Sequence, residues 1–381
     1  MVIRTLQHLI EQSLFKKKTL VIFGARQVGK TTLVEQIVHN HLGETLFLNG
    51  DDADIRELLT NVNPTRLLPV IGSHKIVVLD EAQRIPETGL ATKIIHDNFP
   101  AIQLLVTGSS AFDLASKINE PMTGRKFEFF LHPFSFGEMC AYHGFLTEKR
   151  LIEHRMVFGY YPDIALHVGD ETKLLKNLAS SFLYKDLLRI EQIHKPVLLE
   201  KILKALALQI GNEVSFNELA QLLGSDKGTI EKYIDLLEKT YIIFRLTGFN
   251  RNVRNEIKKG RKFYFFDNGI RNAILGNLLP LNVRSDTGAL WENFLLSERL
   301  KFLSNKDVDS LPYFWRTTQQ QEIDYLEETG GELAAYEFKW SPAGKAHLSK
   351  TFTSTYPGTS FHVITPKNFE EFIYRHPPSP A

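Results

Sequence analysis

The chain is poor in cysteine, in long apolar runs and in net charge, and each shortage excludes a class of protein. With Cys140 as its single cysteine, it cannot form an internal disulfide framework or a cysteine-based zinc site. Its histidines are scattered and lack HExxH or similar metal-binding spacing. The 45 lysines and arginines balance 44 acidic residues, so any site for a polyanion has to be a local patch.

The marks of export and of membrane insertion are also missing. No apolar run approaches the roughly 18 residues of a membrane span. A lysine run at residues 16–18 follows the apolar N-terminal residues, which is the wrong order for a signal peptide. We therefore expect a soluble, cytoplasmic protein without a membrane partner. The 381 residues allow roughly two or three domains, and a hydrophobic fraction of 43% is typical of globular proteins.

Short apolar strands alternate with helical patterns in the first part of the chain, up to about Pro133. Apolar runs without alternation are typical of strands buried on both faces, and the intervening helices predict a parallel α/β sheet. The clearest expected strands are residues 19–23, 45–48, 75–79 and 102–106.

A phosphate-binding motif, GxxxxGK[ST], follows the first of these strands and opens a helix. Its glycines let backbone N–H groups point at phosphate oxygens, the lysine supplies a charge to the β- and γ-phosphates, and the final hydroxyl can hold Mg²⁺. The alternative interpretation is a glycine-rich turn that occurs by chance. The expected nucleotide-binding residues are Gly24, Ala25, Arg26, Gln27, Val28, Gly29, Lys30, Thr31 and Thr32.

Two carboxylates end the third expected strand. Asp80 is placed to hold Mg²⁺ through water, together with Thr31. Glu81 is placed to polarise the attacking water. An acidic turn at a strand end is the alternative interpretation. With the phosphate-binding loop upstream, the pair indicates that ATP and Mg²⁺ are the cofactors.

Two further elements are candidates for the same site. The fourth strand ends in Thr107-Gly108-Ser109-Ser110, and Ser109 is a candidate sensor of the γ-phosphate or the attacking water, although this pattern also makes ordinary turns. Arg125 is a candidate arginine finger, acting in its own chain or from a neighbour; a surface salt bridge is the alternative.

A different pattern begins at Pro196. The order helix, helix, tight turn, helix and strand over residues 196–250 predicts a winged helix-turn-helix. Its third helix carries Glu231, Asp235 and Glu238, which speaks against base reading by that helix. A basic stretch at residues 251–262 is either a phosphate-contacting segment or a charged linker.

These motifs resemble a prokaryotic AAA+-type ATPase family whose C-terminal domain has long been of unknown function. That domain resembles the PD-(D/E)XK fold of restriction endonucleases, and the ring-forming habit of AAA+ relatives implies a homo-oligomer. The match covers about residues 15–340. Besides the phosphate-binding loop it is carried by Leu79-Asp-Glu-Ala-Gln83, Thr107-Gly-Ser-Ser110, Gly124-Arg125, Leu131-His-Pro-Phe-Ser-Phe-Gly-Glu138, Gly159-Tyr-Tyr-Pro162, Lys262-Phe-Tyr-Phe-Phe-Asp267-Asn-Gly269 and Glu337-Phe-Lys339.

The expected fold class is therefore α/β, with an AAA+-like parallel sheet, then an all-α and winged-helix unit, then a restriction-endonuclease-like α/β domain. The expected segments are a P-loop ATPase core at 1–145, a helical lid or connector at 146–195, the winged helix at 196–250, the nuclease-like domain at 251–375, and a disordered tail at 376–381.

A hairpin is expected over residues 321–340 of the last domain. If the glycines at 330–331 form a two-residue turn, Asp324 lies directly opposite Glu337. In the same register Glu322 lies opposite Lys339. Glu337 and Lys339 then share one face with Asp324.

Paired carboxylates suit a hard divalent cation, so Asp324 and Glu337 are candidate metal ligands. Lys339 could orient or activate the attacking water. The resemblance makes Glu292, on the preceding helix, the matching third acid. The alternative is a solvated hairpin with alternating charges, so that the domain binds DNA without cutting it.

Three functions remain open at this point. One is a DNA-directed ATPase whose nuclease-like domain cuts or grips DNA. The second is a nucleotide-driven switch that binds a partner protein or DNA without cutting. The third is a P-loop kinase for a small molecule, which the neighbouring Asp80 and Glu81 and the two further domains disfavour.

Overall fold

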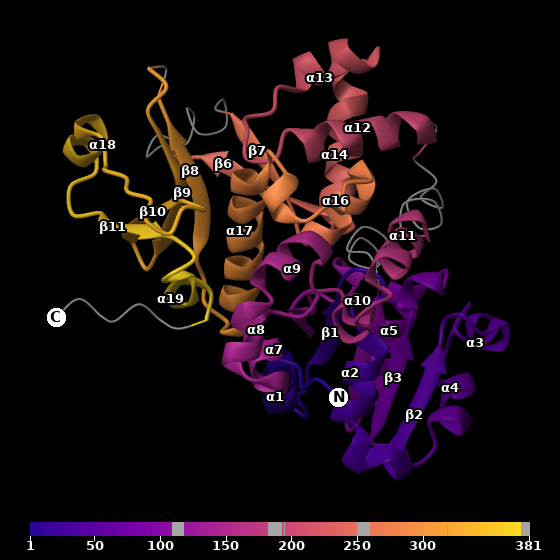
Figure 1. The fold of residues 1–381 in the computed structure, drawn as a ribbon. Helices are drawn as coiled ribbons and strands as arrows, with labels where there is room; N and C mark the ends of the chain where they lie inside the picture. The colour runs from indigo at the N-terminus through magenta and orange to yellow at the C-terminus, as the bar shows by residue number, and fades with distance from the viewer. Residues whose placement is uncertain (109–117, 182–192, 194, 250–259, 318, 375–381) are drawn as a thin grey trace. The chain divides into compact units, whose positions relative to one another are not determined.

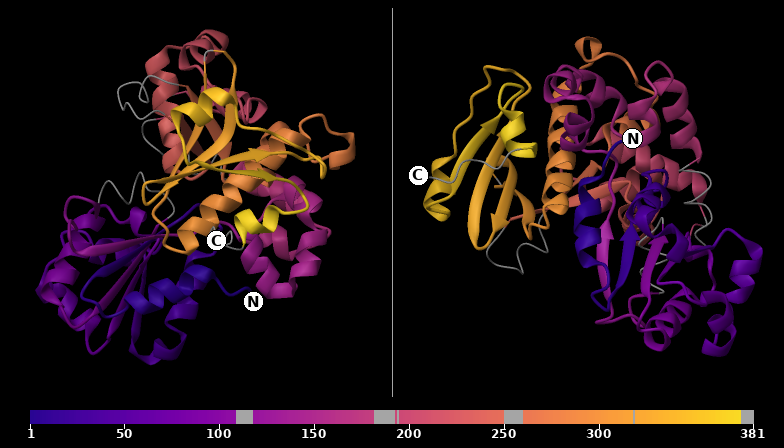
Figure 2. Two further views of the ribbon diagram at one scale, coloured as in Figure 1. Left: turned by 90° about the vertical axis from the view of Figure 1, so that its left-hand side faces the viewer. Right: turned by 90° about the horizontal axis from the view of Figure 1, so that it is seen from below.

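A computed structural model of the chain describes residues 1–108, 118–181, 193, 195–249, 260–317 and 319–374 (Figures 1 and 2). It contains two compact units. The first comprises residues 1–134 and 239–241, and the second comprises residues 135–238 and 242–381. The tail expected to be disordered, residues 376–381, lies outside the described residues, and the five expected segments stay a prediction.

A five-stranded parallel sheet forms the centre of the first unit, in the order β2-β3-β4-β1-β5. Every side chain of β1, β3 and β4 is buried, because helices cover both faces of a parallel sheet. The sequence therefore shows apolar runs rather than alternation. The strands are β1 (Thr19–Phe23), β2 (Thr45–Asn49), β3 (Ile76–Asp80), β4 (Gln103–Gly108) and β5 (Lys126–Phe130).

Helices and 3₁₀ turns connect these strands. Apolar residues of α4 and α5, such as Leu67 and Ile95, join Val77 and Val106 of the sheet in one core cluster. The helical elements are α1 (Thr5–Ser13), α2 (Lys30–Ile37), η1 (His39–Glu44), α3 (Ala53–Leu58), α4 (Pro64–Ile71), η2 (Ala82–Arg84) and α5 (Thr88–Asn98).

The second unit begins with helices. Ser135 starts α7 through a reciprocal capping box with Glu138. The helical pattern is interrupted at residues 159–161, since α9 ends at Phe158 and α10 starts at Pro162. The helices before its sheet are α7 (Phe136–His143), α8 (Phe145–Arg150), α9 (Ile152–Phe158), α10 (Pro162–Leu166), α11 (Glu171–Ser181), α12 (Pro196–Leu208), α13 (Phe216–Leu223) and α14 (Lys227–Lys239).

A six-stranded mixed sheet follows, in the order β11-β10-β9-β8-β6-β7. The strand expected after the third helix is β6, which pairs antiparallel with β7 and parallel with β8. One sheet thus crosses the expected boundary at residue 250. The remaining elements are β6 (Ile243–Gly248), β7 (Arg261–Phe265), α16 (Asn268–Leu275), η5 (Leu281–Val283), α17 (Thr287–Asn305), β8 (Leu311–Arg316), β9 (Glu322–Thr329), β10 (Glu332–Phe338), α18 (Lys350–Thr355), β11 (Ser360–Ile364) and α19 (Phe369–Ile373).

Helix α17 is tied to this sheet by a buried ion pair. Arg299 donates to both carboxylate oxygens of Glu327 on β9, at 2.8 and 2.6 Å. A further guanidinium bond reaches the carbonyl oxygen of Phe372 in α19, at 2.6 Å. The pair therefore fixes one helix, one strand and the C-terminal helix against each other (Figure 1).

None of the helices in the described parts of the chain combines the length and the apolar character that a membrane span requires.

Candidate functional site

The phosphate-binding loop lies where the sequence predicts it, between β1 and α2, at the carboxyl edge of the parallel sheet. Gly29 caps the helix with a φ of 92°, a conformation that favours glycine. A β-carbon on Gly24 would lie 2.3 Å from the carbonyl oxygen of Leu131, so no larger residue fits there. The loop is thereby held close to the backbone that follows β5.

The side chains of the loop are arranged around its backbone. Val28 is fully buried, and its carbonyl oxygen accepts a 2.9 Å bond from Arg4. Lys30 is 5% exposed, and its ammonium donates to the carbonyl oxygens of Gly24 at 3.1 Å and Ala25 at 2.8 Å. The lysine charge thus lies over the loop. Of the other expected residues, Arg26 is half-buried, and Gln27 and Thr32 are exposed.

Asp80 is the centre of the site. Its Oδ2 accepts a 2.8 Å hydrogen bond from the hydroxyl of Thr31, and its Oδ1 accepts one from the hydroxyl of Thr107. Three segments that are distant in the sequence therefore meet at one carboxylate. The structure brings together the two residues expected to hold the metal and adds Thr107 as a positioning group.

Glu81 follows with the backbone in the left-handed region, at a φ of 48°. Its N–H donates to the Thr107 hydroxyl at 3.2 Å, and its Oε2 accepts a 2.5 Å bond from the amide of Gln83. A non-glycine residue at positive φ stores strain, and such residues cluster at functional sites. The sequence motif showed Asp80 and Glu81, but it did not show that Thr107 and Gln83 hold them.

The oxygen ligands at this point fit a magnesium ion. A hydroxyl and a carboxylate 2.8 Å apart, beside a helix N-terminus, are hard donors of the kind that Mg²⁺ prefers. Thr31 and Asp80 are the residues that would hold the ion, directly or through water.

Of the two further candidates for this site, only Arg125 belongs to the described residues. Ser109 lies outside the described residues. The carbonyl oxygen of Arg125 accepts from the backbone N–H of Thr19 at the start of β1, so Arg125 lies at the opposite end of the strand from the loop. Its guanidinium pairs with Asp97 at 2.9 Å, as in the salt-bridge alternative. This placement is inconsistent with action on the nucleotide of its own chain and leaves the neighbour's nucleotide as the prediction.

The second unit contains the expected carboxylate hairpin. The register predicted from the two-glycine turn is confirmed over five pairs, from Glu332↔Thr329 to Tyr336↔Tyr325. On its other side, β9 is irregular, because Tyr313 pairs with Leu326 whereas Trp315 pairs with Ile323. Two residues, Asp324 and Tyr325, therefore stand opposite one residue of β8. Such a bulge redirects side chains and is common beside functional sites.

The acids of the hairpin have polar partners within the hairpin itself. Asp324 accepts a 2.8 Å bond from the N–H of Phe338. Burial and the negative charge of Asp324 together raise the pKa of Glu337, although Lys339 opposes the shift. Lys339 pairs with Glu337 at 2.8 Å. That Glu322 lies opposite Lys339 stays a prediction, because the paired residues of the hairpin end at Tyr336↔Tyr325.

Glu292 lies near this cluster but has its own partners. Its Oε1 accepts a 2.6 Å bond from the hydroxyl of Tyr264 and lies 3.7 Å from the ammonium of Lys262. Burial raises the pKa of Glu292 to about 7, although the charge of Lys262 opposes this shift. Lys262 is 1% exposed and lies 2.5 Å from Glu322. Sequence reasoning missed this lysine because it belongs to the basic stretch.

The cluster does not form the expected three-acid metal site. Within the described ranges, no three His, Cys, Asp or Glu side chains are grouped to hold a metal ion. The interacting carboxylates of Asp324 and Glu337 still offer hard oxygens to a single divalent cation.

The basic stretch is also different from what its composition suggests. Its first part, residues 251–259, lies outside the described residues. Arg261 stacks on the ring of Phe216 at 4.8 Å, and Lys262 is buried among carboxylates. Lys262 therefore offers no exposed charge for a phosphate backbone, whereas Arg261 is half-buried.

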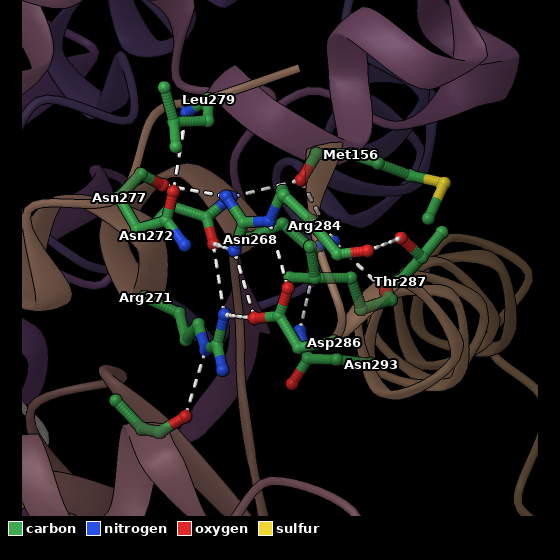
Figure 3. Close-up of polar contacts among 12 residues, drawn as sticks. Met156, Asn268, Arg271, Asn272, Asn277, Leu279, Arg284, Asp286, Thr287 and Asn293 are labelled. Atoms are coloured by element: carbon green, nitrogen blue, oxygen red, sulfur yellow. Dashed lines mark hydrogen bonds and ion pairs between the residues drawn. The ribbon is translucent and has the colours of Figure 1, made fainter. Parts of the chain in front are cut away.

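A buried polar network lies around α16 (Figure 3). Asp286 accepts from Arg284 at 2.9 Å through each of its oxygens and also from Arg271. Asn272 accepts from both arginines and donates to the carbonyl oxygen of Met156 in α9 at 3.1 Å. The motif around residues 267–272 therefore joins the connector helices to α16 and α17. Burial raises the pKa of Asp286, but the arginine bonds outweigh it and lower this pKa to about 2.

Comparison with known families agrees with the first unit. Residues 16–140 match a family described as an AAA domain. Residues 149–280 and 287–375 match two families described as domains of unknown function. Together with the order of the parallel strands, this defines an AAA+-type P-loop ATPase fold, followed by helical and α/β regions.

Related proteins are described only as uncharacterized. One from Mycobacterium tuberculosis is 26% identical over 335 residues, covering 87% of this chain and 72% of its own. One from Methanocaldococcus jannaschii is 24% identical over 341 residues, covering 83% and 74%. One from Haemophilus influenzae is 22% identical over 380 residues, covering 92% and 90%.

Solved structures with related folds include the RuvB Holliday junction branch migration motor of Thermotoga maritima. It is 15% identical with a TM-score of 0.31, covering 66% of this chain and 92% of that one. Drosophila ORC bound to GC-rich DNA and Cdc6 is 11% identical with a TM-score of 0.24, covering 72% and 90%. The fold is defined by the order of the parallel strands and by the matched AAA domain.

Proposed function

We propose that the protein binds and hydrolyses ATP with Mg²⁺, and that hydrolysis drives an event on DNA. The observation that carries the first part is the convergence of Thr31, Asp80 and Thr107 beside Lys30. A loop that only binds a nucleotide, without hydrolysing it, needs the glycines and the lysine. It does not need a carboxylate held by two hydroxyls with a second acid beside it.

Each residue has a role in this proposal. Lys30 and the N–H groups at the start of α2 bind the phosphates. Thr31 and Asp80 hold the magnesium ion, which neutralises developing charge on the phosphates. Glu81 accepts the proton of the attacking water. Ser109, at the end of the fourth strand's motif, is retained as the proposed γ-phosphate sensor.

Steady-state ATP turnover tests this proposal. We expect Lys30→Ala to abolish turnover and to weaken nucleotide binding, because the phosphates lose their charge partner. Lys16→Ala is the matched control, since Lys16 is an exposed lysine of the same unit outside the site. Wild-type protein that binds no ATP, or a Lys30→Ala protein with unchanged turnover, would contradict the proposal.

For the event on DNA, we propose that the second unit binds DNA and cuts it at the carboxylate hairpin. The support is the pairing of Asp324 with Glu337 beside Lys339, an arrangement suited to one divalent cation and a polarised water. Mg²⁺-dependent nicking of plasmid DNA tests the cutting. Glu337→Ala should abolish it, and Glu332→Ala, on the same strand at the turn, should not. Equal cutting by the Glu337→Ala protein removes this claim.

The alternative is a nucleotide-driven switch that binds DNA or a protein partner without cutting. The observation that supports this alternative is that Glu292, the expected third acid, is engaged by Tyr264 and lies 3.7 Å from Lys262. It predicts ATP-dependent DNA binding or assembly in the wild type and in the Glu337→Ala protein alike. Binding that is unchanged by Lys30→Ala would count against it.

A further inference from the structure

The buried ammonium of Lys262 lies where a second cation would otherwise be attracted. It is 2.5 Å from Glu322 and 3.7 Å from Glu292. The side chain starts on β7 and reaches β9 and α17, and its ammonium lies 5.2 Å from the ring centre of Phe314 on β8. One lysine therefore joins three strands and a helix. It lies at the edge of the carboxylate cluster, by which we mean Glu292, Glu322, Asp324 and Glu337.

The energetic reason for this lysine is the restricted solvation of the acids around it, since the side chain of Glu292 is 15% accessible and that of Glu322 is 29% accessible. An isolated buried carboxylate is strongly disfavoured unless a positive charge compensates it. Burial alone would lower the pKa of Lys262, but the charges of Glu292 and Glu322 outweigh it and raise the pKa. The lysine thus stays charged and neutralises this side of the cluster.

The other side of the cluster is organised separately. The carboxylates of Asp324 and Glu337 interact electrostatically, and the ammonium of Lys339 lies 2.8 Å from Glu337. Lys339 is more exposed than Lys262, with 38% of its side chain accessible compared with 1%. A solvated lysine can move aside for a cation or a substrate, whereas a buried one that bridges two acids cannot do so easily.

We propose that Lys262 is a positioning residue of the carboxylate cluster: it takes the place of a cation between Glu292 and Glu322 and limits the cluster to one divalent ion, at Asp324 and Glu337. The proposal rests on the metal site of the proposed function. It also accounts for the lack of a three-acid metal group among the described residues, because Glu292 is engaged by the lysine and by Tyr264.

Binding of Mn²⁺ to the full chain, measured by calorimetry and electron paramagnetic resonance, tests this proposal. The Asp80→Asn background removes the P-loop carboxylate from the count. We expect one Mn²⁺ per chain in that background. Lys262→Met should add a second ion or tighten binding at least about tenfold, because a positive charge about 4 Å from the acids is lost. Lys262→Arg, which retains the charge, should keep the one-ion isotherm.

A Lys262→Met protein that is folded and binds Mn²⁺ as the background does overturns the proposal. If that variant does not fold, two other substitutions decide. Glu322→Gln should leave the isotherm unchanged, because Glu322 faces the lysine, whereas Glu337→Gln should abolish binding. Equal losses in both would make Glu322 a metal ligand and would overturn the proposal.

The same measurement tests the metal site of the proposed function separately from the role of Lys262. If the background protein binds no Mn²⁺, the metal site of the proposed function is removed. A Lys262→Met protein that then gains an ion still supports exclusion by the lysine.

Discussion

At the residue scale, one hydroxyl connects the carboxylate of Asp80 to the backbone of Glu81 in the P-loop site. Thr107 donates to Asp80 and accepts from the N–H of Glu81, although neither neighbour is close to it in the sequence. Groups of this kind orient the residues that bind metal and water. Their removal commonly lowers activity without removing the ligand itself.

We predict that Thr107→Val lowers the kcat of ATP hydrolysis by about 10–100-fold, with a smaller change in nucleotide affinity. The valine retains the shape but cannot hold Asp80 or Glu81. Turnover and nucleotide binding, measured on the same samples, separate the two effects. Thr92→Val is the matched control, because its buried hydroxyl bonds only to the carbonyl oxygen of Thr88 within α5. Equal kcat losses in both variants would show a general effect on stability.

At the element scale, buried charges connect the helices of the second unit to its sheet. These contacts were not predictable from sequence patterns, because Arg299 and Glu327 are 28 residues apart and both look like surface residues. The structure buries them at 5% and 6% exposure. A buried pair of this kind is sensitive to the loss of either member.

We predict that Arg299→Met lowers the free energy of unfolding by about 3–5 kcal/mol, because Glu327 is left as an unpaired buried charge. The double variant Arg299→Met/Glu327→Leu should recover most of that loss, since no charge stays buried. Urea unfolding of the single and double variants measures this. A double variant that is even less stable would show that the pair itself, rather than the orphaned charge, carries the energy.

The arginine–aspartate network around α16 makes the stability of the folded protein depend on pH. The folded pKa of Asp286, about 2, lies below its ordinary value of 3.8, so its contribution is present above pH 3.8 and is lost as pH falls through 2. At 1.4 kcal/mol per pKa unit, it amounts to about 2 kcal/mol. Asp286→Asn should therefore lower stability by about 2 kcal/mol at pH 7 and flatten the loss between pH 4 and pH 2. If the stability of the Asp286→Asn protein falls between pH 4 and pH 2 as steeply as that of the wild type, this role is excluded.

At the scale of the whole molecule, the sequence predicted the parallel sheet closely and the second unit only in outline. Buried strands such as β1 appear as continuous apolar runs, and the P-loop has a fixed spacing, so both are readable locally. The hairpin register also followed from its glycine turn. The bulge at Asp324 and the inward turn of Lys262 depend on neighbours from other strands. No local pattern encodes them.

The candidate arginine finger, Arg125, also leads to a prediction about assembly, which is a property of the whole molecule. If Arg125 acts on the nucleotide of a neighbouring copy, mixing Lys30→Ala with Arg125→Ala protein should restore part of the ATP turnover that each lacks. The first then supplies the arginine and the second supplies an intact loop. Mixing Lys30→Ala with Glu81→Gln should restore nothing, because both defects lie within one site. No recovery in either mixture would remove the role of Arg125 in a neighbour's site.

The most direct test of the central claim, that the P-loop site hydrolyses ATP rather than only binding it, compares bound ATP with released phosphate in the Glu81→Gln protein. We predict ATP binding as in the wild type, with phosphate release lowered about 100-fold or more, because the group that accepts the water's proton is lost. The control Glu57→Gln, at an exposed acid of α3, should bind ATP and release phosphate as the wild type does. Phosphate release by Glu81→Gln at the wild-type rate would contradict the account.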